Sequence, residues 1–179
     1  MGKDAVKSAV PILFLMLSLS TAFTGSAEHV PNVDGSSLNG EQVQLPKGVG
    51  SAAILIVGFS RKSSEQSKQW GVELSKARCG DGQPVQWYEL PALSDVPWLV
   101  RPFVLRAMRS GLTTQLRSHV VPIYTNSEAW KQSVNFSAPD DAYIALINKS
   151  GRVEHLWHGA YDKSRGSEVE QLVCAGDHK

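Results

Sequence analysis

The strongest constraint on the fold of this 179-residue chain is a continuously apolar run in its first half. Residues 52–59 (AAILIVGF) are bounded by turn-forming residues and are too short for a helix of ordinary length. Such a run predicts a strand that is buried on both faces, as in sheets covered on both sides. The polar stretch that follows, residues 60–77, predicts a helix whose Trp70 and Leu74 face the core. The chain is therefore predicted to be an α/β protein.

The remaining pattern predicts alternating strands and helices. Residues 38–45 (LNGEQVQL) predict a small hairpin with an Asn-Gly turn, ahead of the buried strand. Further elements are predicted, in chain order, as a strand at residues 85–90, a helix at 98–108, a strand at 119–124, a short helix capped by Ser127, a β-hairpin at 142–157 and a helix at 167–174. A βαβ unit followed by a hairpin and a terminal helix gives a mixed sheet covered on both faces.

The N-terminus has the three-part pattern of a secretory signal peptide. Lys3 and Lys7 precede an apolar run at residues 9–19, and small residues follow it up to Ala27. The run is well under the ~20 residues that span a bilayer, which counts against the alternative of an uncleaved anchor. Cleavage near Ala27 would leave residues 28–179 as one exported domain, periplasmic or secreted, where disulfides persist. That domain carries equal numbers of acidic and basic side chains, so we expect no nucleic-acid partner.

Three segments resemble the thioredoxin-like superfamily, specifically its peroxiredoxin-related exported branch. They are residues 38–45, the strand end at residues 57–60 (VGFS), and residues 144–153 (IALINKSGRV), which look like the family's closing hairpin. In order of elements, the resemblance covers residues 33–174. It implies a thioredoxin-like three-layer α/β/α sandwich with a mixed sheet and an N-terminal β-hairpin extension.

The cysteines that carry redox chemistry in that superfamily are missing. Its oxidoreductases use a cysteine at the N-terminus of the helix after the first buried strand, where the helix dipole stabilises a thiolate. Residues 59–68 (FSRKSSEQSK) contain no cysteine, and Ser63 or Ser64 stands in the place of the lost nucleophile. We expect these serines to cap the helix, with Glu65 favourable in its first turn. The proline that precedes the family's hairpin strand is also absent, and Ala142 or Tyr143 lies near its place.

One group of thioredoxin-like proteins also lacks the dithiol. The mitochondrial assembly factors for the membrane sector of ATP synthase are similar to this chain in the helix start at residues 59–66, in residues 143–147 and 157–159 and, loosely, around residues 99–103. This similarity implies a chaperone-like binding role. We therefore predict a non-catalytic binding or assembly module of the cell envelope, without a cofactor and with a protein partner there.

An arginine-rich segment is the best candidate for a partner surface. No acidic residue lies between Asp95 and Glu128, whereas Trp98 and Phe103 do. The segment also holds four arginines, Arg101, Arg106, Arg109 and Arg117. Together they predict a basic, partly apolar surface for an anionic partner, which is compatible with peripheral membrane contact. The alternative is that the fold pairs these arginines with acidic side chains from elsewhere in the chain.

The two cysteines leave a second class of function open. In a thioredoxin-like topology Cys79 ends the helix after the first central strand and Cys174 ends the terminal helix, at the same end of one sheet face. We predict a structural Cys79–Cys174 disulfide, which stabilises the fold by roughly 4 kcal/mol in the chain-entropy estimate. If these thiols are instead reactive, the protein is an atypical thiol-disulfide oxidoreductase or a peroxiredoxin-like antioxidant protein.

The histidines predict no metal site. His119, His155, His158 and His178 lack metal-ligand spacing with cysteines, and His155 and His158 lie three apart in a predicted strand, on opposite faces. No catalytic, cofactor-binding or metal-ligating residues are predicted, and we expect a monomer.

Overall fold

A four-stranded mixed sheet forms the centre of the computed structural model, which describes residues 29–176. Its strands, in the spatial order β4-β3-β5-β6, are β4 (Trp87–Pro91), β3 (Ala53–Gly58), β5 (Tyr143–Ile147) and β6 (Val153–His158). β4 runs parallel to β3, while β5 is antiparallel to both β3 and β6. The predicted signal peptide, residues 1–27, lies outside the described residues.

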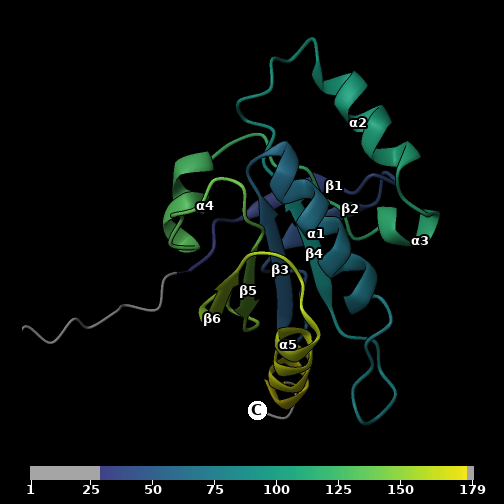
Figure 1. The fold of residues 1–179 in the computed structure, drawn as a ribbon, viewed down its shortest axis with the longest axis vertical. Helices are drawn as coiled ribbons and strands as arrows, with labels where there is room; N and C mark the ends of the chain where they lie inside the picture. Colours follow the sequence, from purple (N-terminus) through teal and green to yellow (C-terminus); the bar gives the residue numbers. More distant parts are fainter. Residues whose placement is uncertain (1–28, 177–179) are drawn as a thin grey trace, which may run out of the picture.

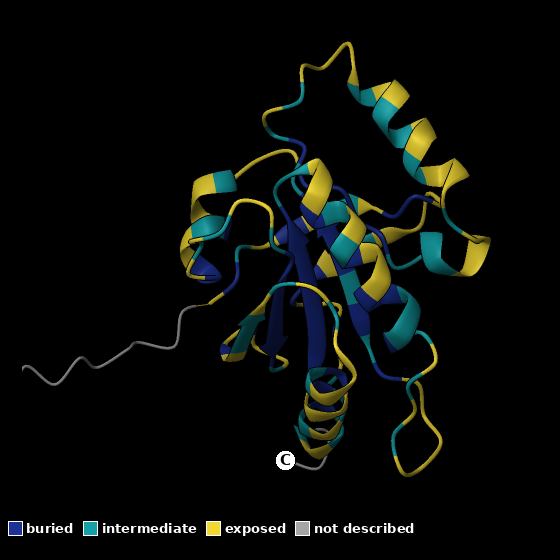
Figure 2. Cartoon of the chain, viewed as in Figure 1, coloured by how far each residue is buried: buried dark blue, intermediate teal, exposed yellow. Residues whose placement is uncertain are grey.

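Both faces of the sheet are covered, and every residue of β3 is buried. On one face Ile54 and Ile56 pack in a core with α1 (Arg61–Leu74) and α5 (Lys163–Gly176). On the other face Leu55 and Val57 pack with α4 (Ser127–Ser133) and with a hairpin of β1 (Val33–Ser36) and β2 (Gln42–Leu45). Figure 1 looks onto the face that α1 and α5 cover, and Figure 2 shows the buried strands between the layers. The predicted layered α/β fold with its N-terminal hairpin is confirmed.

The predicted strand at residues 119–124 is wrong as a regular strand. This segment runs beside β4 but pairs with it only through two isolated parallel bridges, Glu89 with Val120 and Ala92 with Ile123. The N–H groups of Glu89 and Leu93 donate to the carbonyls of His119 and Ile123, but Pro91 between them has no N–H to donate, so the ladder is interrupted there. The segment nevertheless contributes Val121 to the core.

The ends of two helices differ from the predicted ones, and one helix was not predicted. α1 ends at Leu74 rather than near residue 77. Asn126, in the left-handed conformation, is the residue before α4, and Ser127 is the first helical residue rather than the cap. A short helix that was not predicted, α3 (Thr114–Arg117), is capped by the hydroxyl of Thr113.

The helix predicted at residues 98–108 is found as α2 (Arg101–Ser110), with Pro102 in its first turn, where a missing N–H costs little. No residue of α2 is buried, and in Figures 1 and 2 the helix stands apart from the sheet. None of the helices in residues 29–176 is both long and apolar enough to cross a membrane.

Candidate functional site

The start of α1 lies where the thioredoxin-like resemblance places a nucleophilic thiol. Ser60 is the N-cap, rather than Ser63 or Ser64 as expected, and its Oγ accepts a hydrogen bond from the Ser63 backbone N–H at 3.0 Å. The Ser63 Oγ accepts one from the Ser60 N–H at 2.8 Å and donates to the Ser60 carbonyl at 2.9 Å. This reciprocal capping box satisfies backbone donors that the helix leaves unpaired. The buried Ser63 hydroxyl is therefore fully engaged in holding the helix start.

Ser64 bonds to the same backbone. Its Oγ donates to the Ser60 carbonyl at 3.0 Å. The first turn of α1 contains no acidic residue, so the expected place of Glu65 in that turn is wrong. The helix begins at Arg61, which puts Glu65 in the second turn, where the helix dipole acts on it less.

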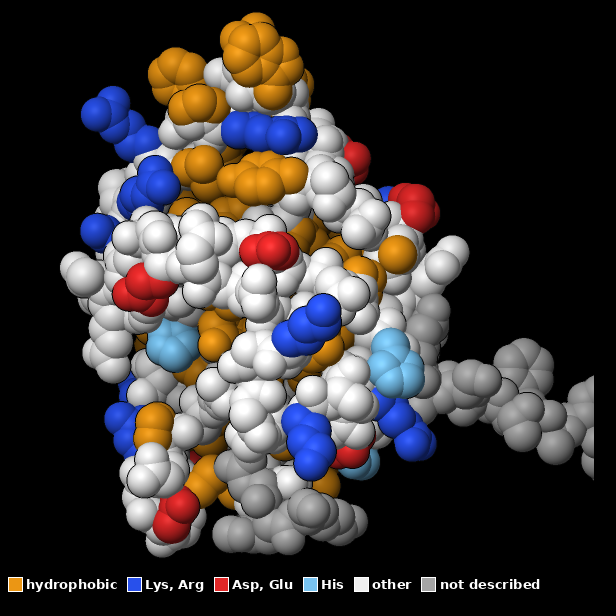
Figure 3. Space-filling model, turned by 180° about the vertical axis from the view of Figure 1, so that it is seen from behind, with side chains coloured by type: hydrophobic (Ala, Val, Ile, Leu, Met, Phe, Trp, Pro, Cys, Tyr) orange, Lys and Arg blue, Asp and Glu red, His pale blue; other side chains and the backbone are white. Residues whose placement is uncertain are grey.

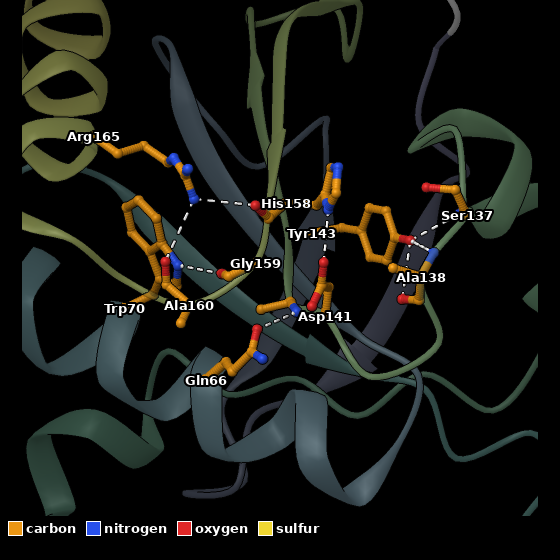
Figure 4. A network of polar contacts seen from close by, with 11 residues as sticks. Gln66, Trp70, Ser137, Ala138, Asp141, Tyr143, His158, Gly159, Ala160 and Arg165 are labelled. Atoms are coloured by element: carbon orange, nitrogen blue, oxygen red, sulfur yellow. Dashed lines mark hydrogen bonds and ion pairs between the residues drawn. The ribbon is translucent and has the colours of Figure 1, made fainter.

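Hydrogen bonds join α1 to the residue before β5 and to the residue after β6, as Figure 4 shows from close by. The Gln66 Oε1 accepts a hydrogen bond from the Ala142 backbone N–H at 3.0 Å, and the Trp70 Nε1 donates to the Gly159 carbonyl at 3.0 Å. A proline at position 142 could not donate this hydrogen bond. Ala142, one of the two residues expected near the place of the family's proline, thus joins the sheet to α1 through a donor that proline lacks.

Histidine and tyrosine side chains complete this network. The Nδ1 of His158 lies 2.7 Å from the Asp141 Oδ2, and the Tyr143 hydroxyl accepts hydrogen bonds from the backbone N–H groups of Ser137 and Ala138 (Figure 4). These contacts join loops to strands. Among residues 29–176 no three His, Cys, Asp or Glu side chains gather as a metal site, and His178 lies outside that range.

A groove of about 670 Å³ opens beside the start of α1. Its walls are the first half of α1, the carboxyl ends of β3 and β4, and the inner side of α2. The wall that α2 contributes is apolar and consists of Val104, Ala107 and Met108, with Leu112 just beyond the helix. Because this groove separates α2 from the sheet, the helix keeps its inner side available to a ligand or partner.

Glu89 of β4 places a buried carboxyl in the groove wall, with only 4% of the residue exposed. Among the described residues, no hydrogen bond or ion pair involves its carboxyl group. Desolvation raises the pKa of Glu89 from 4.5 to about 7, and the nearby positive charge of Lys68 opposes the rise. Sequence reasoning missed this residue. Strand alternation could have found it, since Glu89 follows Trp87 by two positions and must share its core-facing side.

The structure does not pair the four arginines with carboxylates, because the ion pairs of the described residues all involve other side chains. The Arg101 Nε donates to the Val96 carbonyl at 2.9 Å. The Nε atoms of Arg109 and Arg117 likewise donate to carbonyls, of Leu38 and Leu112 respectively, each at 3.0 Å. Arg106 is exposed. Neutral carbonyls leave the positive charge uncompensated, so the region stays basic.

Cys79 and Cys174 are joined by a disulfide, with their Cα atoms 5.4 Å apart. Cys79 does not end α1 as expected but lies in the loop beyond it, while Cys174 is in α5. α1 has 14 residues, so its two ends are about 20 Å apart. The groove lies along the first half of α1 and the disulfide beyond its far end. The structure therefore separates both sulfur atoms from the groove.

No protein-family model and no curated protein matches this chain. Solved structures match its fold. The exposed lipoprotein thioredoxin Etrx1 of Streptococcus pneumoniae aligns with a TM-score of 0.57 at 12% identity, covering 79% of this chain and 99% of that one. BsSco, described as a member of the Sco family of cytochrome c oxidase assembly proteins, aligns at 0.55 and 10% identity, covering 86% and 95%. A peroxiredoxin-like protein of Aquifex aeolicus aligns at 0.51 and 10%, covering 82% and 86%.

These likenesses establish a thioredoxin-like fold. At such low identity they assign no activity, which depends on the residues of the site.

Proposed function

We propose that this protein is a non-catalytic, thioredoxin-like binding or assembly module of the cell envelope. The observation that carries the proposal is the separation of sulfur from the groove. The groove adjoins a helix start capped by Ser60 and Ser63, whereas both cysteines are bonded to each other beyond the other end of α1. Without a thiolate at the helix start, the groove retains the walls for binding and lacks the nucleophile for exchange.

The groove suits a protein segment better than a small polar substrate. One wall is formed by apolar side chains of α2, which has no buried residue and lies open to solvent on its other side. An apolar segment of a partner can replace water along that wall, and burial of apolar surface favours such association. The partner of this module is accordingly a protein with an exposed apolar segment, and the module itself is a monomer.

The envelope location rests on the predicted signal peptide at residues 1–27 and on the disulfide, which persists in oxidising compartments. The solved structures with a similar fold include an exposed lipoprotein thioredoxin and a member of a family of cytochrome c oxidase assembly proteins. The assembly role also follows from the resemblance of short segments to dithiol-less ATP synthase assembly factors, which no matching family model or curated protein tests.

Site-specific photo-crosslinking tests the binding function. A photoreactive amino acid replaces Ala107, which lines the groove, and in a control replaces Lys163, which is exposed on α5. We expect one protein adduct in the native envelope from position 107 and none from position 163. Val104→Asp should abolish the adduct without changing the circular dichroism spectrum. Adducts of equal yield at both positions, or an adduct that survives Val104→Asp, would contradict the proposal.

The disulfide favours a second candidate, an atypical thiol-disulfide oxidoreductase that uses Cys79 and Cys174. Both cysteines are half-buried, so a reductant can reach them. Insulin reduction and peroxide consumption by the purified protein separate the two functions. A binding module gives rates equal to the buffer blank. Activity that Cys79→Ser abolishes would establish the oxidoreductase instead.

A further inference from the structure

Large apolar side chains protrude at one end of the molecule. Trp98 is 73% exposed, Leu99 64%, Val100 45% and Phe103 72%, all in the last residues before α2 or in its first turn. We call these four residues the tip. Figure 3 shows hydrophobic side chains gathered at the top of the molecule, with Lys or Arg side chains among and beside them. Isolated exposed apolar residues are common in soluble proteins, whereas a contiguous protruding group marks an interaction surface.

The tip is held outward by its own backbone and by Arg101. The Arg101 guanidinium donates hydrogen bonds to the carbonyls of Val96 at 2.9 Å and Ser94 at 3.4 Å, and lies 5.0 Å from the centre of the Tyr124 ring. The Val100 N–H donates to the Pro97 carbonyl at 2.8 Å, which closes a turn just before the helix. The tip therefore projects from a braced loop.

Most charged side chains near the tip are basic, and the exposed Asp95, three residues before Trp98, is an exception. No acidic residue occurs from residue 96 to residue 127, and Arg106 and Arg109 are exposed on the same helix. Because none of these arginines pairs with a carboxylate among residues 29–176, their charge can act on a partner. The surface that complements the tip must therefore offer an apolar layer edged by negative charge.

We propose that the tip docks this protein on an anionic lipid bilayer, with Trp98 and Phe103 inserted at headgroup depth and the arginines of α2 against lipid phosphates. A bilayer surface provides an apolar layer beneath an anionic one, which matches both properties of the tip. Aromatic side chains are enriched at this interface, because the acyl chains on one side of it are apolar and the headgroups on the other side are hydrated. Such docking is separate from the groove, so it does not depend on the binding function proposed above.

The fluorescence of Trp98 in the full-length protein tests this insertion directly. Of the other four tryptophans, Trp70, Trp87 and Trp130 are at most 2% exposed and report little of the solvent or lipid, whereas Trp157 is half-buried and adds a background signal. The difference between the wild-type protein and Trp98→Phe isolates the Trp98 signal. Vesicles contain phosphatidylcholine alone or mixed with phosphatidylglycerol, with bromine atoms on the acyl chains as quenchers.

We expect quenching and a blue shift of the Trp98 emission with the anionic vesicles, and at least severalfold less with phosphatidylcholine alone. Arg106→Gln should weaken the partitioning measured by this signal about fivefold, the effect of one basic residue near an anionic surface. Phe103→Ser should weaken it further, while Lys163→Gln, a matched charge change on α5, should leave it unchanged. All four substituted residues are exposed, so equal melting temperatures confirm intact folds.

Three results would overturn the inference. The first is Trp98 emission that does not respond to anionic vesicles, and the second is equal quenching by both vesicle types. The third is a Trp98 response that requires a membrane protein in the vesicles, because the tip would then bind protein and not lipid.

Discussion

Cys79 and Cys174 are 95 residues apart in the chain, yet their Cα atoms lie 5.4 Å apart because the loop after α1 and the end of α5 meet below the same face of the sheet. Both cysteines pack against the core cluster that contains Trp70, Leu74 and Val173. The bond thus closes a loop that contains most of the domain.

Removing this bond should destabilise the fold without changing its architecture. Closing a loop of 95 residues lowers the entropy of the unfolded chain, which is worth about 4.7 kcal/mol in the chain-entropy estimate. The double variant Cys79→Ser, Cys174→Ser should therefore lose about that much free energy of unfolding. Urea denaturation followed by circular dichroism measures it. The wild-type protein in excess dithiothreitol serves as a chemical control and should lose the same amount. An unchanged denaturation midpoint in both would show that the bridge contributes nothing.

The capping box at the start of α1 should be worth a measurable amount of stability. Ser60→Ala removes the acceptor for the Ser63 N–H and should cost about 1 kcal/mol, as at other serine N-caps. Ser60→Thr keeps both the acceptor and the hydroxyl that donates to the Asp140 Oδ1 at 3.3 Å, and should restore most of the loss. Thermal unfolding of the two variants gives the comparison, and an alanine variant as stable as the wild type would exclude this role for Ser60.

Gly71 is required by the close packing of α1 on β4. A Cβ atom at this position would lie 2.9 Å from the Trp87 Cζ3 atom, and that ring is buried and stacked on His119. Because the ring has no room to move, Gly71→Ala should lower the free energy of unfolding by about 1–3 kcal/mol, despite the better helix propensity of alanine.

Gly80→Ala is the matched control, since nothing lies within 4 Å of its Cβ position. Chemical denaturation should show Gly80→Ala close to the wild type. If both alanine variants have the stability of the wild type, α1 is packed less tightly on β4 than the structure indicates.

Stability should fall as the Glu89 carboxyl ionises. Burial raises its pKa from 4.5 to about 7, so the folded state binds this proton more tightly than the unfolded state. The stabilisation from this bound proton is complete below about pH 4.5 and is lost as the pH rises through 7. The total loss of unfolding free energy is about 3 kcal/mol. Glu89→Gln stays neutral and should lack this decline.

The measurement is the free energy of unfolding at about pH 5 and about pH 8 for the wild type and Glu89→Gln, compared as differences between the two pH values. Glu65→Gln, an exposed groove residue, is the control and should follow the wild type. A wild-type decline that persists undiminished in Glu89→Gln would assign the titration to another group.

Features set by neighbouring residues were predictable from the sequence. The uninterrupted apolar run predicted β3, and the Asn39-Gly40 turn predicted the hairpin of β1 and β2. A serine cap of α1 was predicted at Ser63 or Ser64, whereas Ser60 is the N-cap and Ser63 completes the capping box. The absence of a cysteine from that helix start is likewise plain in the sequence. Each of these depends on backbone preferences and side-chain periodicity within a few residues, so no distant contact is needed.

Only the tertiary structure decided which distant groups meet. The sequence left the arginines open to ion pairing, and the fold instead gives Arg109 the Leu38 carbonyl. The sequence likewise did not show that Glu89 lines a groove, because residues of α1 and α2 form the other walls. Such contacts depend on where whole helices pack, and a carboxyl changes its pKa, or an arginine finds a carbonyl, only after that packing has removed water.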